Sequence, residues 1–254
     1  MKLKDKISLV TGGGRGIGKA IAIALAEEGS TVVVNDIDEK AAQEVSRKII
    51  ANGGKSIAIK ADVSKRKDVK NMMKRIIREF KRIDILINNA GIQKETPFIS
   101  ITEEEWDNII GTNLKGAFLC SQFAAKEMIK QGGGKIINIS SIHESFPRKN
   151  IAHYASSKGG LAMLTKVMAL ELAEYKISVV AIAPGVVATS MNEELLRSPQ
   201  KMREMISRIP LRRIAKPEDI ARVVVYVASE EANYITGTTI YVDGGFSLIG
   251  HDKP

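Results

Sequence analysis

The chain has 254 residues, which is long enough for a sizeable hydrophobic core and fits one large α/β domain as well as two small ones. Its 44% hydrophobic and 26% charged residues are typical of a globular protein and exclude a disordered one. Cys120 is the single cysteine, which excludes an internal disulfide and a cysteine-cluster metal site, so we expect no metal.

The formal net charge of +9 raises the question of a nucleic-acid partner. Lysines and arginines are spread over the whole chain, often beside Glu or Asp, which favours a solvated surface instead. No apolar run approaches the ~18 residues of a membrane span, and the run before Thr11 is shorter than a secretory signal requires. We therefore expect a cytoplasmic protein with neither a nucleic-acid nor a membrane partner.

Apolar, β-branched runs alternate along the chain with patterns of helical spacing. The predicted strands cover 7–12, 31–36, 56–63, 83–91, 135–140, 177–185 and 238–245. The predicted helices cover 16–29, 38–54, 67–80, 103–129, about 154–174 and 217–229, the last opened by Pro217.

This alternation predicts one α/β domain, 1–254, with a doubly wound parallel sheet and helices on both faces. Ligands of such sheets bind beyond the carboxyl ends of the strands. The segment around 188–215 follows a strand end and lacks the regular alternation, so we expect a substrate lid there. The alternative is a peripheral helical insertion.

The sequence "TGGGRGIG", Thr11 to Gly18, lies between the first predicted strand and the first helix. Glycines allow a tight turn, and a helix N-terminus favours the pyrophosphate of a dinucleotide. An acidic residue, Asp36, follows at about the expected distance. We therefore predict a nucleotide cofactor, with contacts from the residues Gly12, Arg15, Gly16, Ile17 and Gly18.

Asp36 bears on which cofactor binds. A carboxylate at this position accepts hydrogen bonds from the ribose hydroxyls of NAD and repels the 2′-phosphate of NADP. Arg15 is the opposing signal, because a guanidinium in the glycine turn could bind that phosphate. We expect NAD to be preferred, with NADP as the alternative. Asp62 and Val63 end the third strand, where Asp62 could accept from the adenine amino group.

Four motifs together resemble the classical short-chain dehydrogenases/reductases: "TGGGRGIG", "NNAG" at 88–91, the spacing Ser141…Tyr154…Lys158, and "PGVVAT" at 184–189. The stretches "SSIHESFP…HYASSKGG" and "WDNIIGTNLKGAFL" look most like the glucose 1-dehydrogenase branch. The resemblance implies a seven-stranded Rossmann-like sheet and a homotetramer. It also implies that Asn113, Ser141, Tyr154 and Lys158 are catalytic, Asn113 through a helix kink whose carbonyl holds a water in a relay to Lys158.

The same resemblance implies further cofactor contacts. They are Asn89, Ala90 and Gly91 near the adenine ribose, Tyr154 and Lys158 at the nicotinamide ribose, and Pro184, Gly185, Val187 and Thr189 at the nicotinamide amide and pyrophosphate. The chain departs from the branch at Asp36 and Ile37, where dual-cofactor sugar dehydrogenases carry a tyrosine and a basic residue. It departs again at Gln93, where an acidic sugar contact is expected.

The chemistry explains the Tyr-Lys spacing. Hydride transfer at a carbinol carbon also requires movement of the hydroxyl proton, and a phenol can accept it only if its pKa of ~10 is lowered. Lys158 is one helical turn after Tyr154, so its ammonium is expected to lower that pKa. Ser141 is expected to hold the substrate oxygen. The alternative base is His143.

Substrate contacts are predicted for Ser141, His143, Gln93 and Tyr154, with Glu144 as a further candidate. Ser140 and His153 are interpreted as structural. The expected activity is an NAD(P)-dependent dehydrogenase acting on a secondary alcohol or hemiacetal, with an aldose as substrate. The alternatives are a 3-oxoacyl-(acyl-carrier-protein) reductase and, from another class, a nucleotide-sensing protein without turnover.

Overall fold

The structure is a computed structural model that describes residues 1–248, so residues 249–254 of the predicted domain lie outside the described part. Seven parallel strands form a single sheet in the order β3-β2-β1-β4-β5-β6-β7. The strands are β1 Ile7–Val10, β2 Thr31–Asp36, β3 Lys55–Lys60, β4 Ile85–Asn88, β5 Gly134–Ile139, β6 Ile177–Pro184 and β7 Thr239–Val242. The predicted single-domain, doubly wound fold is confirmed.

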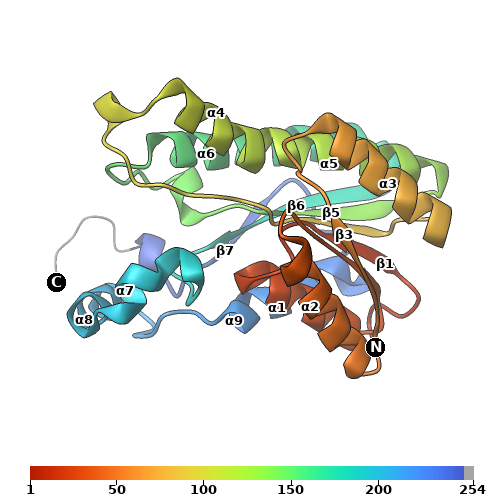
Figure 1. The fold of residues 1–254 in the computed structure, drawn as a ribbon, viewed down its shortest axis with the longest axis horizontal. Coiled ribbons are helices and arrows are strands. Elements are labelled where there is room, and N and C mark those ends of the chain that lie inside the picture. Colours follow the sequence, from red (N-terminus) through yellow and green to blue (C-terminus); the bar gives the residue numbers. More distant parts are fainter. Residues whose placement is uncertain (249–254) are drawn as a thin grey trace.

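Nine α-helices lie within the described residues. They are α1 Gly16–Glu27, α2 Glu39–Ala51, α3 Arg66–Phe80, α4 Glu103–Ile110, α5 Gly116–Lys130, α6 Ala152–Leu172, α7 Glu193–Arg197, α8 Pro199–Ser207 and α9 Pro217–Ala228. Figure 1 shows α3, α4, α5 and α6 above the sheet and α1, α2 and α9 below it. None of these helices is both long and apolar enough to cross a bilayer.

The two faces of the sheet are buried by alternate residues of the same strands. Val32 and Val34 of β2 pack in the core beneath the sheet with α1, α2 and α9, whereas Val33 packs in the core above it with α3 and α5. Successive side chains of a strand point to opposite faces, so a sheet covered on both sides needs continuous apolar strands. This requirement explains the runs "TVVV" and "ISVVAIA".

Local signals position the helix starts near the site. Asp38 caps α2 by accepting from the Ala41 N–H, and Thr102 caps α4 by accepting from the Glu105 N–H. The helix predicted over 103–129 is interrupted by a π-helical turn, Gly111–Lys115, in which the Gly116 N–H bonds the Gly111 carbonyl. Single π turns are frequent at functional sites, and this one contains Asn113.

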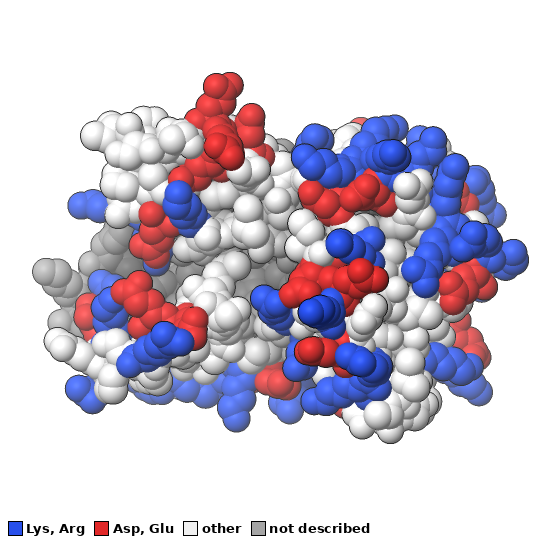
Figure 2. Space-filling view, viewed as in Figure 1, with Lys and Arg blue, Asp and Glu red and all other residues white. Residues whose placement is uncertain are grey.

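The strand order reverses where β1 lies between β2 and β4. Open α/β sheets bind ligands at such a point, beyond the carboxyl ends of the strands. Figure 2 shows acidic and basic side chains interspersed over one face of the molecule. Residues 1–248 contain no group of three His, Cys, Asp or Glu side chains placed to hold a metal ion.

Candidate active site

One long cleft runs along the carboxyl edge of the sheet. Its walls include every residue predicted to contact the cofactor and, of the substrate candidates, all but Glu144, from the glycine turn through 89–91 and 141–158 to 184–189. Among the predicted catalytic residues, Asn113 does not line the cleft, since it is buried at 1% exposure. The sequence therefore located one continuous cleft, while the roles of its residues stay predictions.

The glycine turn is packed too tightly for side chains. A Cβ on Gly12, whose φ is +60°, would lie 2.8 Å from the Ala90 Cα, and one on Gly18 would lie 2.2 Å from the Gly12 carbonyl oxygen. The Asn89 side chain donates to the carbonyls of Thr11 and Gly12 at 3.0 Å each. The turn thus brings the N-terminus of α1 against the loop after β4, as a pyrophosphate cradle requires.

Asp36 ends β2 and is fixed to the same turn. Its carboxylate accepts from the Gly14 N–H and from the Asp38 N–H, each at 3.0 Å. These two bonds hold the carboxylate at the cleft wall and leave further lone pairs for ribose hydroxyls. Arg15 forms an ion pair with Asp38, so its charge is already partnered by this chain.

Asp62 and Val63 follow β3, the strand that pairs with β2, and also line the cleft. The Asp62 carboxylate accepts from the Ser64 N–H at 2.9 Å and from its hydroxyl at 2.7 Å. Val63 packs against α5, since a Cβ on Gly116 would lie 2.8 Å from its Cγ2. Asp62 therefore stabilises its own turn, and its predicted bond to adenine would be additional.

Ser141, Tyr154 and Lys158 gather at the other end of the cleft. Ser141 follows β5, and the other two residues lie one turn apart at the start of α6. Their exposures are 6%, 7% and 4%. The Lys158 Nζ donates to the Ile139 carbonyl at 2.8 Å and lies 5.7 Å from the Tyr154 ring centroid.

Burial shifts both titrating groups toward their neutral forms. It raises the pKa of Tyr154, against a hydrogen bond with Ser141 and the charge of Arg148, which lower it. It lowers the pKa of Lys158 to about 8, against the charge of Glu144. For the chain's own groups, desolvation of the phenolate outweighs the Ser141 hydrogen bond and the Arg148 charge, and the expected effect of Lys158 on the Tyr154 pKa stays a prediction.

Asn113 joins the loop after β4 to α6. Its side chain accepts from the Ile92 N–H at 2.8 Å and donates to the Ile92 carbonyl at 2.9 Å and to the Ser157 Oγ at 3.1 Å. The side chain is thus occupied by protein contacts. The predicted relay to Lys158 would run through the Asn113 backbone carbonyl in the π turn.

The predicted substrate contacts lie beside Tyr154. The His143 Nδ1 bonds the Phe146 carbonyl at 2.9 Å, and burial lowers the pKa of the ring, which is 6.3 Å from that of Tyr154. Gln93 is half-buried and lines the cleft. Glu144 instead accepts from the Ser140 hydroxyl at 2.6 Å and from the Tyr241 hydroxyl at 3.0 Å, so it braces the loop against β7.

The segment predicted as a lid forms the outer wall. Helices α7 and α8 contribute apolar and charged side chains to the cleft: Met191 just before them, then Glu194, Leu195, Lys201 and Met205. Lys201 pairs with Glu194, and Arg148 pairs with Glu95 at the same mouth. The location fits a lid, and its movement stays a prediction.

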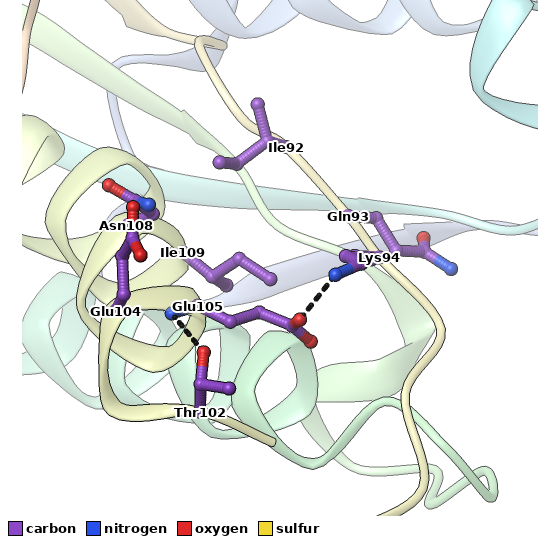
Figure 3. Close-up of a pocket in the computed structure, with 8 residues that line it drawn as sticks. All are labelled: Ile92, Gln93, Lys94, Thr102, Glu104, Glu105, Asn108 and Ile109. Carbon is purple, nitrogen blue, oxygen red and sulfur yellow. Dashed lines mark hydrogen bonds and ion pairs between the residues drawn. The ribbon is translucent and has the colours of Figure 1, made fainter. Parts of the chain in front are cut away.

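Sequence reasoning missed a buried pair behind Tyr154. His153 is fully buried, and its Nδ1 accepts from the Tyr154 N–H at 2.9 Å. Its Nε2 lies 2.8 Å from a carboxylate oxygen of Glu105 on α4. Figure 3 shows that the Glu105 carboxylate also accepts a hydrogen bond from Lys94, and that the Glu105 backbone N–H donates to the Thr102 hydroxyl. No local pattern links two residues so far apart in sequence.

Comparison with known proteins gives a consistent picture. A family model described as enoyl-(acyl carrier protein) reductase matches residues 12–247. The chain is 44% identical over 245 residues to the 3-oxoacyl-[acyl-carrier-protein] reductase FabG of Staphylococcus epidermidis, covering 96% of this chain and 100% of that protein. It is 40% identical over 249 residues to the FabG of Thermotoga maritima, covering 98% and 100%.

Solved structures agree. A short-chain type dehydrogenase/reductase from Mycobacterium marinum superposes with a TM-score of 0.92 at 36% identity, covering 96% of each chain. A gluconate 5-dehydrogenase from Burkholderia cenocepacia, in complex with NADP and tartrate, superposes with a TM-score of 0.93 at 34% identity, covering 97% of each chain.

Proposed function

The chain belongs to the classical short-chain dehydrogenase/reductase family, and we propose that it interconverts a ketone and a secondary alcohol with NAD(H) in preference to NADP(H). Family membership makes it an NAD(P)-dependent oxidoreductase. One observation carries the proposal: Ser141, Tyr154 and Lys158 line one end of a cleft whose other end carries the fixed carboxylate of Asp36. A nucleotide sensor without turnover would not need the end lined by Ser141, Tyr154 and Lys158.

The residues divide the work of a reduction. A bound nicotinamide would supply the hydride. The Ser141 hydroxyl would hold the ketone oxygen, and the Tyr154 phenol would donate the proton to that oxygen. Burial raises the pKa of Tyr154, which favours the protonated phenol that this step requires. Lys158, anchored on the Ile139 carbonyl, would hold the nicotinamide ribose and return a proton to the tyrosine.

The cofactor preference rests on Asp36. A 2′-phosphate at about 4 Å from this carboxylate would be repelled by roughly 4 kcal/mol at an effective dielectric of ~20, before screening by salt. Arg15 could offset the repulsion, but Asp38 already pairs with its guanidinium. The opposing observation is that a related gluconate 5-dehydrogenase was crystallised with NADP.

For the substrate we favour a 3-oxoacyl thioester. The relatives at 40–44% identity are named 3-oxoacyl-[acyl-carrier-protein] reductases, which supports the alternative predicted from sequence over the aldose. Met191, Leu195 and Met205 give the outer wall an apolar surface that suits an acyl chain. The aldose and the glucose 1-dehydrogenase branch stay predictions without such support.

A second candidate is an oxo or hydroxy acid of the sugar type. Arg148 and Lys201 line the cleft mouth, and a guanidinium binds a carboxylate through two parallel hydrogen bonds. Their present partners, Glu95 and Glu194, are exposed, and exposed ion pairs contribute only about 0–1 kcal/mol. A substrate carboxylate could therefore replace one of them.

Exposed apolar side chains support the predicted homotetramer. One group lies on α5 and α6 and comprises Phe118, Met163, Val167 and Leu170. Tyr226 on α9, Tyr234 in the loop before β7 and Tyr241 on β7 are also exposed. A dimer of dimers would bury exposed apolar side chains of this kind. Sedimentation of the purified chain would test the assembly.

The test of function is an absorbance screen at 340 nm. Acetoacetyl thioesters, 5-ketogluconate and simple ketones would each be offered with NADH and with NADPH, and aldoses and polyols with NAD⁺ and NADP⁺. The proposal predicts the highest kcat/KM for the acetoacetyl thioester with NADH. The highest kcat/KM for 5-ketogluconate would establish the second candidate, and a preference for NADPH would contradict the role given to Asp36.

A further inference from the structure

The buried pair His153–Glu105 links three parts of the site. Glu105 lies in the first turn of α4, and His153 lies in the first turn of α6 directly before Tyr154. The two side chains are 10% and 0% exposed, and their polar atoms are 2.8 Å apart. Figure 3 shows Glu105 pointing toward Lys94 on the loop that follows β4.

The hydrogen bonds fix the state of the imidazole. Because His153 Nδ1 accepts from the Tyr154 N–H, the proton of the neutral ring lies on Nε2. That Nε2–H must then donate to Glu105. Bonds from Lys94, Thr96 and His153 hold the pKa of Glu105 to about 2, so the acceptor is a carboxylate at neutral pH. The pair therefore fixes the first turn of α6 through its backbone.

The same carboxylate fixes the substrate loop. Lys94 Nζ donates to Glu105 at 2.5 Å, and Thr96 also lowers the pKa of that carboxyl. Elsewhere on the loop Asn113 holds Ile92, and Arg148 holds Glu95. Ile92 is thus held through its backbone, and Lys94 and Glu95 through their side chains. By contrast, no hydrogen bond within residues 1–248 holds the Gln93 side chain, which lines the cleft.

We infer that His153 and Glu105 are positioning residues that hold Tyr154 and the loop carrying Gln93 in one fixed arrangement. Neither residue lines the catalytic end of the cleft beside the Ser141 hydroxyl, so neither touches the reacting atoms. They act through the Tyr154 backbone and through Lys94. A misplacement of about 1 Å in a catalytic group can lower a rate by up to about a hundredfold, so a tether of this kind should affect kcat.

The test compares adjacent carboxylates of α4. Glu105→Ala removes the acceptor of His153, whereas Glu105→Gln keeps an acceptor oxygen. Glu104→Ala is the matched control, since it removes the neighbouring negative charge from the same helix turn without touching His153. The readouts are kcat with the best substrate of the screen, the NADH Kd from fluorescence, and the number of NADH-binding sites, so that rates refer to folded protein.

We expect Glu105→Ala to lower kcat about tenfold per NADH-binding site with the NADH Kd unchanged. Glu105→Gln should recover kcat to within about threefold of the wild type, and Glu104→Ala should leave it unchanged. His153→Asn, which keeps a short polar side chain but cannot reach Glu105, should lose as much as Glu105→Ala. This second variant tests the same contact if Glu105→Ala yields little folded protein.

The inference rests on the proposed role of Tyr154, and the outcomes separate the two. If Tyr154→Phe keeps normal turnover, the proposed function is wrong. If Tyr154→Phe is inactive while Glu105→Ala and His153→Asn keep wild-type kcat per site, only the positioning role is wrong. An equal loss in Glu104→Ala would also overturn it, because the effect would then belong to the charge of the helix terminus.

Discussion

The two ends of the cleft are built differently. At the end that we propose to be catalytic, Ser141, Tyr154 and Lys158 are each at most 7% exposed, and burial raises the pKa of the tyrosine and lowers that of the lysine. At the recognition end Arg15 is 69% exposed, and Asp36 is held by backbone N–H groups. Desolvation shifts the pKa values of Tyr154 and Lys158 at one end, and hydrogen bonds fix the position of the Asp36 carboxylate at the other.

This difference suggests a division of labour. A buried proton donor keeps its proton and reacts in a site from which water is largely excluded. A carboxylate fixed on a turn discriminates between ligands by charge and position, without a change in its own protonation. Changes at the catalytic end should therefore alter the rate of reaction, and changes at the recognition end should alter which cofactor binds.

The largest effect is expected at Tyr154. Tyr154→Phe removes the proposed proton donor and should lower kcat by at least about a thousandfold, while NADH binding stays near the wild type. Steady-state rates and fluorescence titration measure the two quantities. Tyr175→Phe is the control, because Tyr175 is exposed and lies just after the end of α6. This variant should leave kcat unchanged. A normal kcat in Tyr154→Phe would show that Tyr154 is not the proton donor of the reaction.

The buried charge of Lys158 should lower the free energy of unfolding of the protein. Its folded pKa of about 8 lies below the unfolded value of ~10.4, so below pH 8 the fold must hold a buried ammonium. Lys158→Met should therefore be inactive yet more stable than the wild type near pH 7, by up to roughly 3 kcal/mol.

The sign of this effect depends on pH in a defined way. Between pH 8 and about 10.4 the unfolded wild type binds more protons than the folded one, so wild-type stability rises relative to Lys158→Met. Urea unfolding at pH 7, 8, 9 and 10 should show the advantage of the variant shrinking step by step. A constant difference across this range would show that Lys158 is not desolvated as described.

A change at Asp36 should alter the preference for NADH over NADPH. Asp36→Ala is expected to lower the ratio of kcat/KM with NADH to that with NADPH by about tenfold or more. Asp38→Asn keeps the cap of α2 and weakens the partner of Arg15, so it should shift the ratio in the same direction but less. If the two variants change the ratio equally, Arg15 rather than Asp36 determines which cofactor is preferred.

The smallest effect is expected at Gln93. Its half-buried side chain lines the cleft, so Gln93→Ala should raise the substrate KM by about fivefold and leave the NADH Kd unchanged. A change in NADH Kd of similar size would place Gln93 at the cofactor instead. The measurement is a pair of titrations, substrate at saturating NADH and NADH alone.

The sequence predicted the sheet because parallel strands buried on both faces are continuous apolar runs, as in "TVVV" of β2. It also located the cleft, because motifs at strand ends share one edge of the sheet. It did not predict the raised Tyr154 pKa, since desolvation depends on packing. His153 was interpreted as packing because its partner, Glu105, lies on a different helix.

The most direct test compares Tyr154→Phe and Asp36→Ala in parallel. Stopped-flow absorbance gives the single-turnover rate of hydride transfer at saturating NADH, and fluorescence gives the Kd for NADH and for NADPH. The division of labour predicts that Tyr154→Phe loses hydride transfer but keeps both Kd values, and that Asp36→Ala keeps the transfer rate but loses its NADH preference. If each variant changes both quantities to the same extent, the two ends do not act separately and the account is wrong.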